Sequence, residues 1–239
     1  NKKNDELAYK LLFKIYTLQN NYLKQEQLLK NAIDKKKFDD EFVVKSYFFY
    51  PNFFNSLDQI KNIRNKFKKK ISNLKKERKL PTLNLSTNIL KPPNFELSYD
   101  GNDNLKINQE LINLYEEIYP ILKQLNNYEF SSEKNKKIKI GFISEFFTDH
   151  TIMKLFKGII YKLNKDIFEV YVFHSDKTRE GVKFNEIKEN VILYNYENII
   201  LPQSFENKVK IIRDKNLDIL FYPDIHMSTN LYYLTLIKL

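Results

Sequence analysis

The stretch KIKIGFISEFFTDHTIMKLFKGII, Lys137 to Ile160, contains the pattern that decides the fold. It begins with a segment of strand type, in which apolar and charged residues alternate. It ends with a segment whose apolar residues recur at helical spacing. The polar loop between the two segments contains His150. This order predicts the first strand, loop and helix of an α/β fold.

The same alternation continues to the end of the chain. Two further strands are predicted at FEVYVFHS and LDILFYPDI, and a weaker one near NVILYNY; helices are predicted at SFENKVKIIRDKN and TNLYYLTLIKL. Short connections between such elements are typical of a parallel sheet, so residues 136–239 are expected to form a Rossmann-like lobe. No Gly-rich fingerprint follows the first strand, so dinucleotide binding in the usual mode is not expected.

Residues 1–50 are predicted to be a helical extension. Their apolar residues recur at helical spacing in two segments that are separated near residues 19–21. This helical pair is similar to a single tetratricopeptide-like repeat, although the sequence contains no second copy.

Residues 51–135 are expected to join the extension to the lobe. A long basic helix begins after Asn55 or Ser56. In the connector that follows, the alternation of Phe95, Leu97 and Tyr99 predicts a strand. In the next helical segment, Pro120 either introduces a kink or begins a second short helix.

The composition limits the class of protein. The 239 residues include no cysteine, which excludes disulfides and thiolate metal sites and favours a reducing, cytoplasmic compartment. No segment approaches the roughly 18 apolar residues of a membrane helix. The chain begins without Met and stops within an apolar pattern, so both ends are expected to be cut from a longer protein.

The net charge of +10 leaves open an anionic partner such as nucleic acid. Its basic residues are spread along the chain, except for a concentration between Lys61 and Lys79. Phe67 is the one aromatic residue there, whereas a single-strand stacking platform needs several. A solvated helix face is therefore the expected role of this stretch.

The three histidines, His150, His174 and His226, are all predicted to lie in loops at the carboxyl ends of strands. Ligands bind at this edge of open parallel sheets, and imidazole can exchange a proton near neutral pH. The alternative is an ordinary strand-to-helix turn, in which Asp149 or Thr151 caps the next helix. No zinc site is expected, because no histidine pair has the spacing of helical ligands.

Several motifs resemble, in order and spacing, the O-linked N-acetylglucosamine (O-GlcNAc) transferase family. KIKIGFISEFFTDHTIMKL is similar to the opening of its catalytic region, FEVYVFHS to its second strand, and NLDILFYPDIHMSTNLYYLTLIKL to its third strand and the helix after it. NFELSYDGNDNLKINQELINLYEEIYPIL is similar to a segment that precedes the catalytic region in bacterial members. The resemblance covers Asn94 to Leu239.

The resemblance implies an inverting glycosyltransferase of the GT-B type. Members of the family have two Rossmann-like lobes and move N-acetylglucosamine from UDP-GlcNAc to Ser or Thr hydroxyls of proteins. Lys137 to Leu239 would be the first part of the N-terminal lobe, truncated at its C-terminus. Because the second lobe supplies most contacts to UDP, the chain is expected to be inactive alone. The implied partners are a protein acceptor and the UDP-sugar, with no metal, no further cofactor, no membrane and no nucleic acid.

The resemblance also implies site residues. His150 would be the loop histidine of the family, acting as an acceptor-side contact or as the base, and His226 is a second catalytic candidate. The ring of His150 is expected to be partly exposed in a cleft and not used as a helix cap. The implied substrate-binding residues are Phe147, Thr148, Asp149, Thr151 and Asp224. Asp149 stands where the family usually has Asn.

Two other readings stay open. The chain could be a non-catalytic scaffold or nucleic-acid-binding module, and a steep salt dependence of RNA or DNA binding would identify it. It could also belong to a glycosyltransferase that uses another sugar donor, because donor choice is determined mainly in the second lobe.

Overall fold

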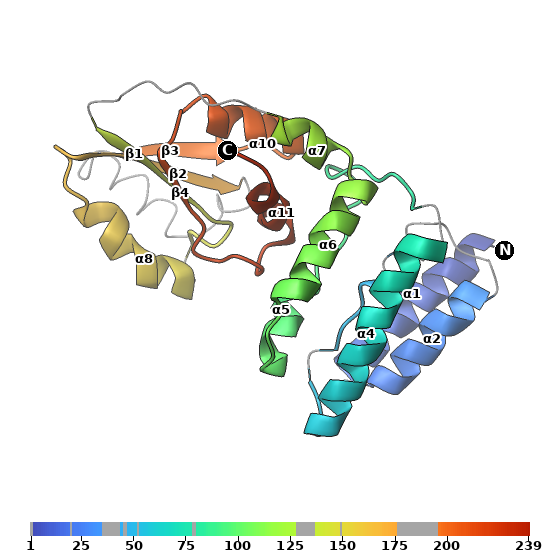
Figure 1. Cartoon of the computed structure of the whole chain (residues 1–239). Coiled ribbons are helices and arrows are strands. Elements are labelled where there is room, and N and C mark those ends of the chain that lie inside the picture. Colours follow the sequence, from blue (N-terminus) through green and yellow to red (C-terminus); the bar gives the residue numbers. More distant parts are fainter. Residues whose placement is uncertain are drawn as a thin grey trace. The chain divides into compact units, whose positions relative to one another are not determined.

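The computed structural model describes residues 2–19, 21–34, 44, 47–51, 53–77, 80–127, 137–148, 150–175 and 196–239. Their contacts form two compact units (Figure 1). The helical unit contains Asn1–Asn84 and Leu90–Pro120, and the sheet unit contains Leu85–Ile89 and Ile121–Leu239. The boundaries of these two units differ from those of the three predicted segments, 1–50, 51–135 and 136–239. No described helix is long and apolar enough to cross a membrane.

The sheet unit is built on a four-stranded parallel sheet. Its strands are β1 (Ile138–Ile143), β2 (Phe168–Ser175), β3 (Tyr196–Leu201) and β4 (Ile219–Phe221), in the order β3-β2-β1-β4. The prediction of an α/β fold with a Rossmann-like sheet is thus confirmed. Of the strand predicted near NVILYNY, residues 190–195 lie outside the described residues, and β3 begins at Tyr196, the last residue of that motif.

Helices α8 (Thr151–Lys162) and α10 (Phe205–Arg213) lie on opposite sides of the sheet (Figure 1). On the α8 side, Phe142 of β1 and Val172 of β2 are buried in one cluster with Met153 of the helix. On the other side, an added Cβ at Gly141 would meet Leu217 at 2.7 Å. The alternation along β1 therefore supplies both hydrophobic layers of the sheet unit.

The final segment of the chain packs beside α7 (Ile121–Asn126). Asn126 Nδ2 donates to the Leu236 carbonyl over 3.0 Å, and the Arg213 guanidinium donates to the carbonyls of Leu125 (2.5 Å) and Lys238 (2.6 Å). The helix predicted from residue 229 is only α11 (Thr229–Tyr232), followed by the 3-10 helix η3 (Tyr233–Leu236). Because α7 begins just after Pro120, the second of the two expectations for this proline is confirmed.

The helical unit contains α1 (Lys2–Leu18), α2 (Tyr22–Asp34), α4 (Leu57–Glu77), α5 (Asn94–Leu97), the 3-10 helix η1 (Ser98–Asp100) and α6 (Leu105–Ile118). The break between α1 and α2 confirms the predicted helical pair. Leu7 and Leu11 of α1 are 58% and 53% exposed, so their apolar stripe is not buried against the described residues.

The long basic helix is α4, and apolar side chains along it are buried, with Phe67 at 2% and Leu74 at 1% exposed, whereas Leu57 at its start is 75% exposed. Its first turn is capped by Ser56, whose hydroxyl accepts from the Gln59 N–H over 3.1 Å. Arg64 is also buried, at 7% exposed. This cation points into the unit rather than to solvent.

The predicted strand at residues 95–99 is wrong, because these residues form α5 and η1. In a strand, Phe95, Leu97 and Tyr99 would share one face. In the structure Leu97 is fully buried, whereas Phe95 and Tyr99 are 36% and 63% exposed. The Leu97 N–H donates to the Pro93 carbonyl over 2.9 Å, which closes a helical turn instead.

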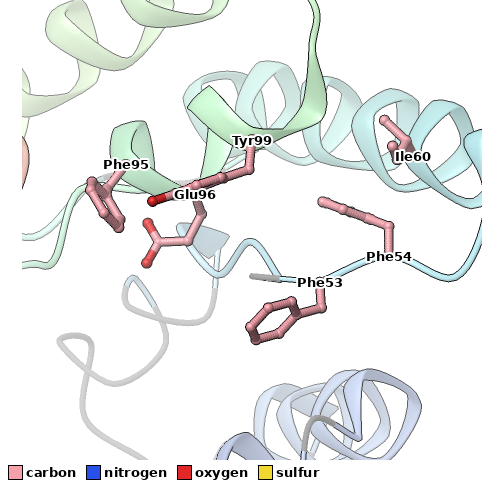
Figure 2. A pocket seen from close by; sticks show the side chains of 6 residues that line it. All are labelled: Phe53, Phe54, Ile60, Phe95, Glu96 and Tyr99. Atoms are coloured by element: carbon pink, nitrogen blue, oxygen red, sulfur yellow. The ribbon is translucent and has the colours of Figure 1, made fainter.

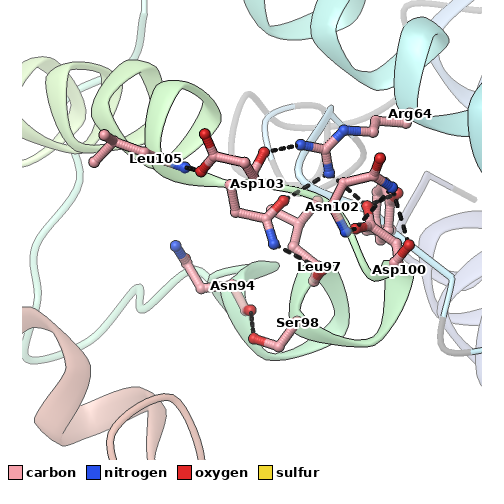
Figure 3. Close-up of polar contacts among 10 residues, drawn as sticks. Arg64, Asn94, Leu97, Ser98, Asp100, Asn102, Asp103 and Leu105 are labelled. Atoms are coloured by element: carbon pink, nitrogen blue, oxygen red, sulfur yellow. Dashed lines mark hydrogen bonds and ion pairs between the residues drawn. The ribbon is translucent and has the colours of Figure 1, made fainter.

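A polar network holds η1 against α4 (Figure 3). The Arg64 guanidinium donates to Asp100 Oδ2 over 2.5 Å and to Asn104 Oδ1 over 2.6 Å, and also to the Asp103 carbonyl. The Tyr50 hydroxyl donates to the same Asp100 oxygen over 2.9 Å. Tertiary contacts to Arg64 thus decide the conformation of a segment whose own pattern indicates a strand.

Candidate functional site at the carboxyl edge of the sheet

The loops that follow β1 and β4 are joined at the carboxyl edge of the sheet. Asn230 Nδ2 donates to Glu145 Oε1 over 2.9 Å. Ser144, the residue after β1, is fully buried, and its hydroxyl accepts from the Phe146 N–H over 2.8 Å. We call Ser144, Glu145, Asp224, His226 and Asn230 the edge cluster.

Asp224 carries the carboxylate of the edge cluster that burial perturbs most. Asp224 is only 4% exposed, and its Oδ2 has no hydrogen-bond partner among the described residues. Burial raises the pKa of Asp224 to about 6, with a further increase from the charge of Glu145 and a decrease from the Ser144 hydroxyl. This carboxyl group can therefore take up or release a proton close to neutral pH.

His226 lies two residues further along the same loop. Its backbone has φ +74°, in the left-handed region that residues other than Gly rarely adopt. Its Nδ1 is buried without a hydrogen-bond partner among the described residues, and its ring centroid lies 5.3 Å from that of Tyr232. Because burial lowers the pKa of His226, the ring is neutral at pH 7 and can accept a proton.

His150 is the N-cap of α8, so the prediction that it does not cap a helix is wrong. Its backbone is extended, with φ −116° and ψ 158°, and its Nδ1 accepts from the Ile152 N–H over 3.2 Å. Its ring lies 4.7 Å from the Phe146 ring and is partly exposed, as predicted. The cap engages Nδ1, so catalysis or binding by His150 would have to use Nε2.

The predicted substrate-binding residues have different environments. Phe147 is fully buried in the hydrophobic cluster beneath α8, so a substrate could reach only its backbone. Thr148 is half-buried and Thr151, the first residue of α8, is exposed. Asp149 lies outside the described residues. The predicted role of these residues in binding stays a prediction.

His174 does not lie in a loop, contrary to the prediction, but within β2, where it is 1% exposed. The sequence also places Ser144 and Glu145 in the loop after the first strand, at the edge where ligands bind, but it gives no indication of a role for Asn230. Asn230 follows Ser228, the N-cap of α11, whose hydroxyl accepts from the Leu231 N–H over 3.1 Å. A helix start is readable in the sequence, but the pairing of Asn230 with Glu145 joins residues 85 positions apart.

The edge cluster is suited to proton transfer and to hydrogen bonding of a polar ligand. In the described part of the chain, no three His, Asp or Glu side chains are close enough to hold a metal ion. Burial raises the pKa of Asp224 to about 6 and lowers the pKa of His226, and both residues have a buried polar atom that lacks a partner among the described residues. Perturbed groups of this kind are concentrated at functional sites.

Comparisons with known proteins match the chain to solved structures but to no family model. No protein-family model and no curated protein matches the chain. Among solved structures, the chain is similar to a mutant of the O-GlcNAc transferase of Thermobaculum terrenum, with 14% sequence identity, a TM-score of 0.48 and 95% of this chain covered. The chain spans 41% of the length of that structure. Similarity at this level carries no argument about function, which has to come from the residues.

Proposed function

We propose that the sheet unit is the first lobe of a two-lobe, GT-B type glycosyltransferase. The observation that carries this proposal is the edge cluster, in which Asp224, with a pKa of about 6, and a neutral His226 follow the same strand of a parallel sheet. Ligands bind at this edge of open α/β sheets. A sugar-transfer enzyme needs a proton acceptor at such a place, because the attacking hydroxyl loses its proton.

In its finer form, the proposal is a protein O-glycosyltransferase of the O-GlcNAc transferase family. It rests on the resemblance of the motifs around His150 and Asp224 and on their order along the chain. The acceptor would be a Ser or Thr hydroxyl of a protein, and UDP-GlcNAc would be the co-substrate, with no further cofactor. The natural setting would be the cytoplasm, and α1 and α2 would belong to a tetratricopeptide-like array.

The proposed reaction is a single displacement with inversion at the anomeric carbon. The hydroxyl oxygen of the acceptor forms a bond to that carbon, while the bond between the carbon and the β-phosphate oxygen breaks and UDP leaves. The hydroxyl proton moves to a base, for which Asp224, His226 Nδ1 and His150 Nε2 are the candidates. The charge on the departing UDP needs cations or a helix N-terminus, which the second lobe would supply.

The test is a transfer assay with the full-length product of the gene, UDP-GlcNAc and a mixture of acceptor proteins. His150→Asn retains a good N-cap and removes the imidazole, whereas His150→Ala removes both. If the ring takes part in the reaction, both variants lose transfer by about a hundredfold. If His150 only caps α8, His150→Asn keeps transfer. Asp224→Asn is expected to lose about a hundredfold if it is the base.

Leu155→Ala is the control, because this α8 side chain is 66% exposed and outside the edge cluster. Parallel assays with other UDP-sugars test the alternative donor. Transfer that survives Asp224→Asn, His226→Ala and both substitutions at His150 would remove the edge cluster and His150 from the reaction. Absence of transfer from any donor, together with salt-dependent binding of RNA, would favour the scaffold reading instead.

A further inference from the structure

The helical unit contains a pocket that no part of the proposed reaction uses. It has a volume of about 480 Å³, within the range of pockets that bind small ligands. Its described lining is largely aromatic (Figure 2) and consists of Phe53, Phe54, Ile60, Phe95, Glu96 and Tyr99. We call it the aromatic pocket.

Two parts of the chain form the aromatic pocket. In Figure 2 the side chains of Phe95, Glu96 and Tyr99 come from α5 and η1, and those of Phe53 and Phe54 come from the segment before α4. The rings of Phe95 and Tyr99 meet edge to face, with ring centroids 5.3 Å apart and an interplanar angle of 76°. These rings thus support one another from the same side of the pocket.

The wall formed by α5 and η1 is held in place by the Arg64 network. Arg64 of α4 donates to Asp100 at the end of η1 and to Asn104, whose amide in turn donates to the Leu97 carbonyl over 2.9 Å. The residues of this wall therefore occupy their positions before any ligand arrives. Preorganisation of this kind reduces the entropy that a ligand would otherwise have to offset on binding.

Glu96 gives the aromatic pocket its charge. The residue is 5% exposed, and its Oε2 is buried with no hydrogen-bond partner among the described residues. Its other oxygen, Oε1, accepts from Lys91 Nζ, whose side chain is 68% exposed and is not part of the described lining. Glu96 lines the pocket beside the rings, and Oε2 is the oxygen of its carboxylate for which the described residues supply no donor.

We propose that the aromatic pocket binds an organic cation, an ammonium or guanidinium group carried on an apolar body. Aromatic faces are negative and attract such cations, and the carboxylate of Glu96 attracts them too. The apolar body would displace water from the rings of Phe53 and Phe95. An anion or a purely apolar ligand would gain no attraction from the carboxylate of Glu96 or from the negative ring faces.

The test is a titration of the full 239-residue chain, followed by the amide NMR signals of residues 95–99. Choline is the first probe, and 3,3-dimethylbutan-1-ol is its neutral analogue of the same shape. Acetyl-lysine amide and acetyl-arginine amide represent a basic side chain of a peptide. We expect saturable shifts with choline or with one of the two amides, at about tenfold lower concentration than for the neutral alcohol. The stronger probe then tells a free small cation from a peptide side chain.

Substitutions assign the binding to the aromatic pocket. Phe53→Ala and Tyr99→Ala change side chains that are 69% and 63% exposed, so the fold is expected to persist while cation binding weakens about tenfold. Leu57→Ala is the matched control, because Leu57 is 75% exposed and outside the described lining. Glu96→Gln is expected to remove the preference for choline over the alcohol.

Equal binding of choline and the alcohol, or no shift of residues 95–99 with any cation, would overturn the proposal. So would cation binding that Phe53→Ala, Tyr99→Ala and Glu96→Gln all leave unchanged. Neither result depends on sugar transfer, because the titration uses no donor and no acceptor.

Discussion

Asp224 is a single residue whose charge should cost the sheet unit stability. Its pKa is 3.8 in an unfolded chain and about 6 in the folded one, so the folded state holds the proton more tightly. The free energy of unfolding therefore falls as the pH rises from about 3.8 to 6, and the full penalty is present above pH 6. Buried polar groups retained at such a cost are typical of functional sites.

Asp224→Asn removes the charge and keeps the shape of the side chain. We expect the variant to be more stable than the parent by roughly 1–3 kcal/mol at pH 7, with the difference vanishing near pH 4. Denaturant unfolding at pH 7 and at pH 4 measures both quantities. A variant that is less stable at pH 7 would contradict the raised pKa. Higher stability combined with lost transfer would assign the carboxylate to function.

His150 is a second residue that shows how one side chain can have two roles. The sequence presents a functional site and a helix cap as alternatives at this position. In the structure Nδ1 accepts from the Ile152 N–H, which leaves the other ring nitrogen for a ligand. The capping role is thus established by geometry, while the functional role remains part of the proposal.

Strand β1 contains a glycine whose place is fixed by packing. A Cβ at Gly141 would lie 2.7 Å from Leu217 Cδ1, 2.9 Å from Phe173 Cε2 and 3.0 Å from Leu220 Cδ1. Gly141→Ala is therefore expected to lower the free energy of unfolding by about 1–3 kcal/mol through overpacking. Thermal or denaturant unfolding of the purified variant measures it.

Gly158 is the matched control in the neighbouring helix α8. A Cβ there would meet nothing within 4 Å. Gly158→Ala should raise stability by up to about 1 kcal/mol, because alanine favours the helix. Opposite signs for the two substitutions would support the packing of β1 against Leu217 and Leu220. A neutral Gly141→Ala would show that these side chains move aside at little cost.

The division into two compact units predicts the unfolding behaviour of the whole chain. Asp100 lies in the helical unit, and its side chain is fully buried beside Arg64. Asp100→Asn leaves the Arg64 cation buried without its partner, a change that costs roughly 3–5 kcal/mol. We expect two transitions in calorimetry, with Asp100→Asn lowering one of them and Gly141→Ala the other. A single transition that shifts with both variants would show that the units unfold together.

Low pH should destabilise the helical unit because it protonates the carboxylate of Asp100. Burial alone would raise the pKa of Asp100, but hydrogen bonds from the Asn102 N–H, Arg64 and Tyr50 outweigh it, so the pKa lies below 3.8. The stabilisation is present above pH 3.8 and is lost as the pH falls through the lower folded value. The Asp100→Asn variant should lack this part of the acid sensitivity.

The sequence by itself determined the features that depend on local pattern. Alternation and helical spacing predicted β1, β2, α8 and α10, and the order of strands and helices predicted the parallel sheet. They also predicted the α1 and α2 pair and the long helix α4. These features follow from periodicity, which neighbouring residues carry in full.

The tertiary structure alone decided the features that depend on residues far apart in the chain. The segment around Leu97 alternates like a strand, but Arg64 holds its neighbours in η1 through Asp100. Glu145 acquires a partner in Asn230, and Asp224 acquires its raised pKa, only when the loops after β1 and β4 come together. Burial and long-range pairing set these properties, and neither is encoded in the spacing of adjacent residues.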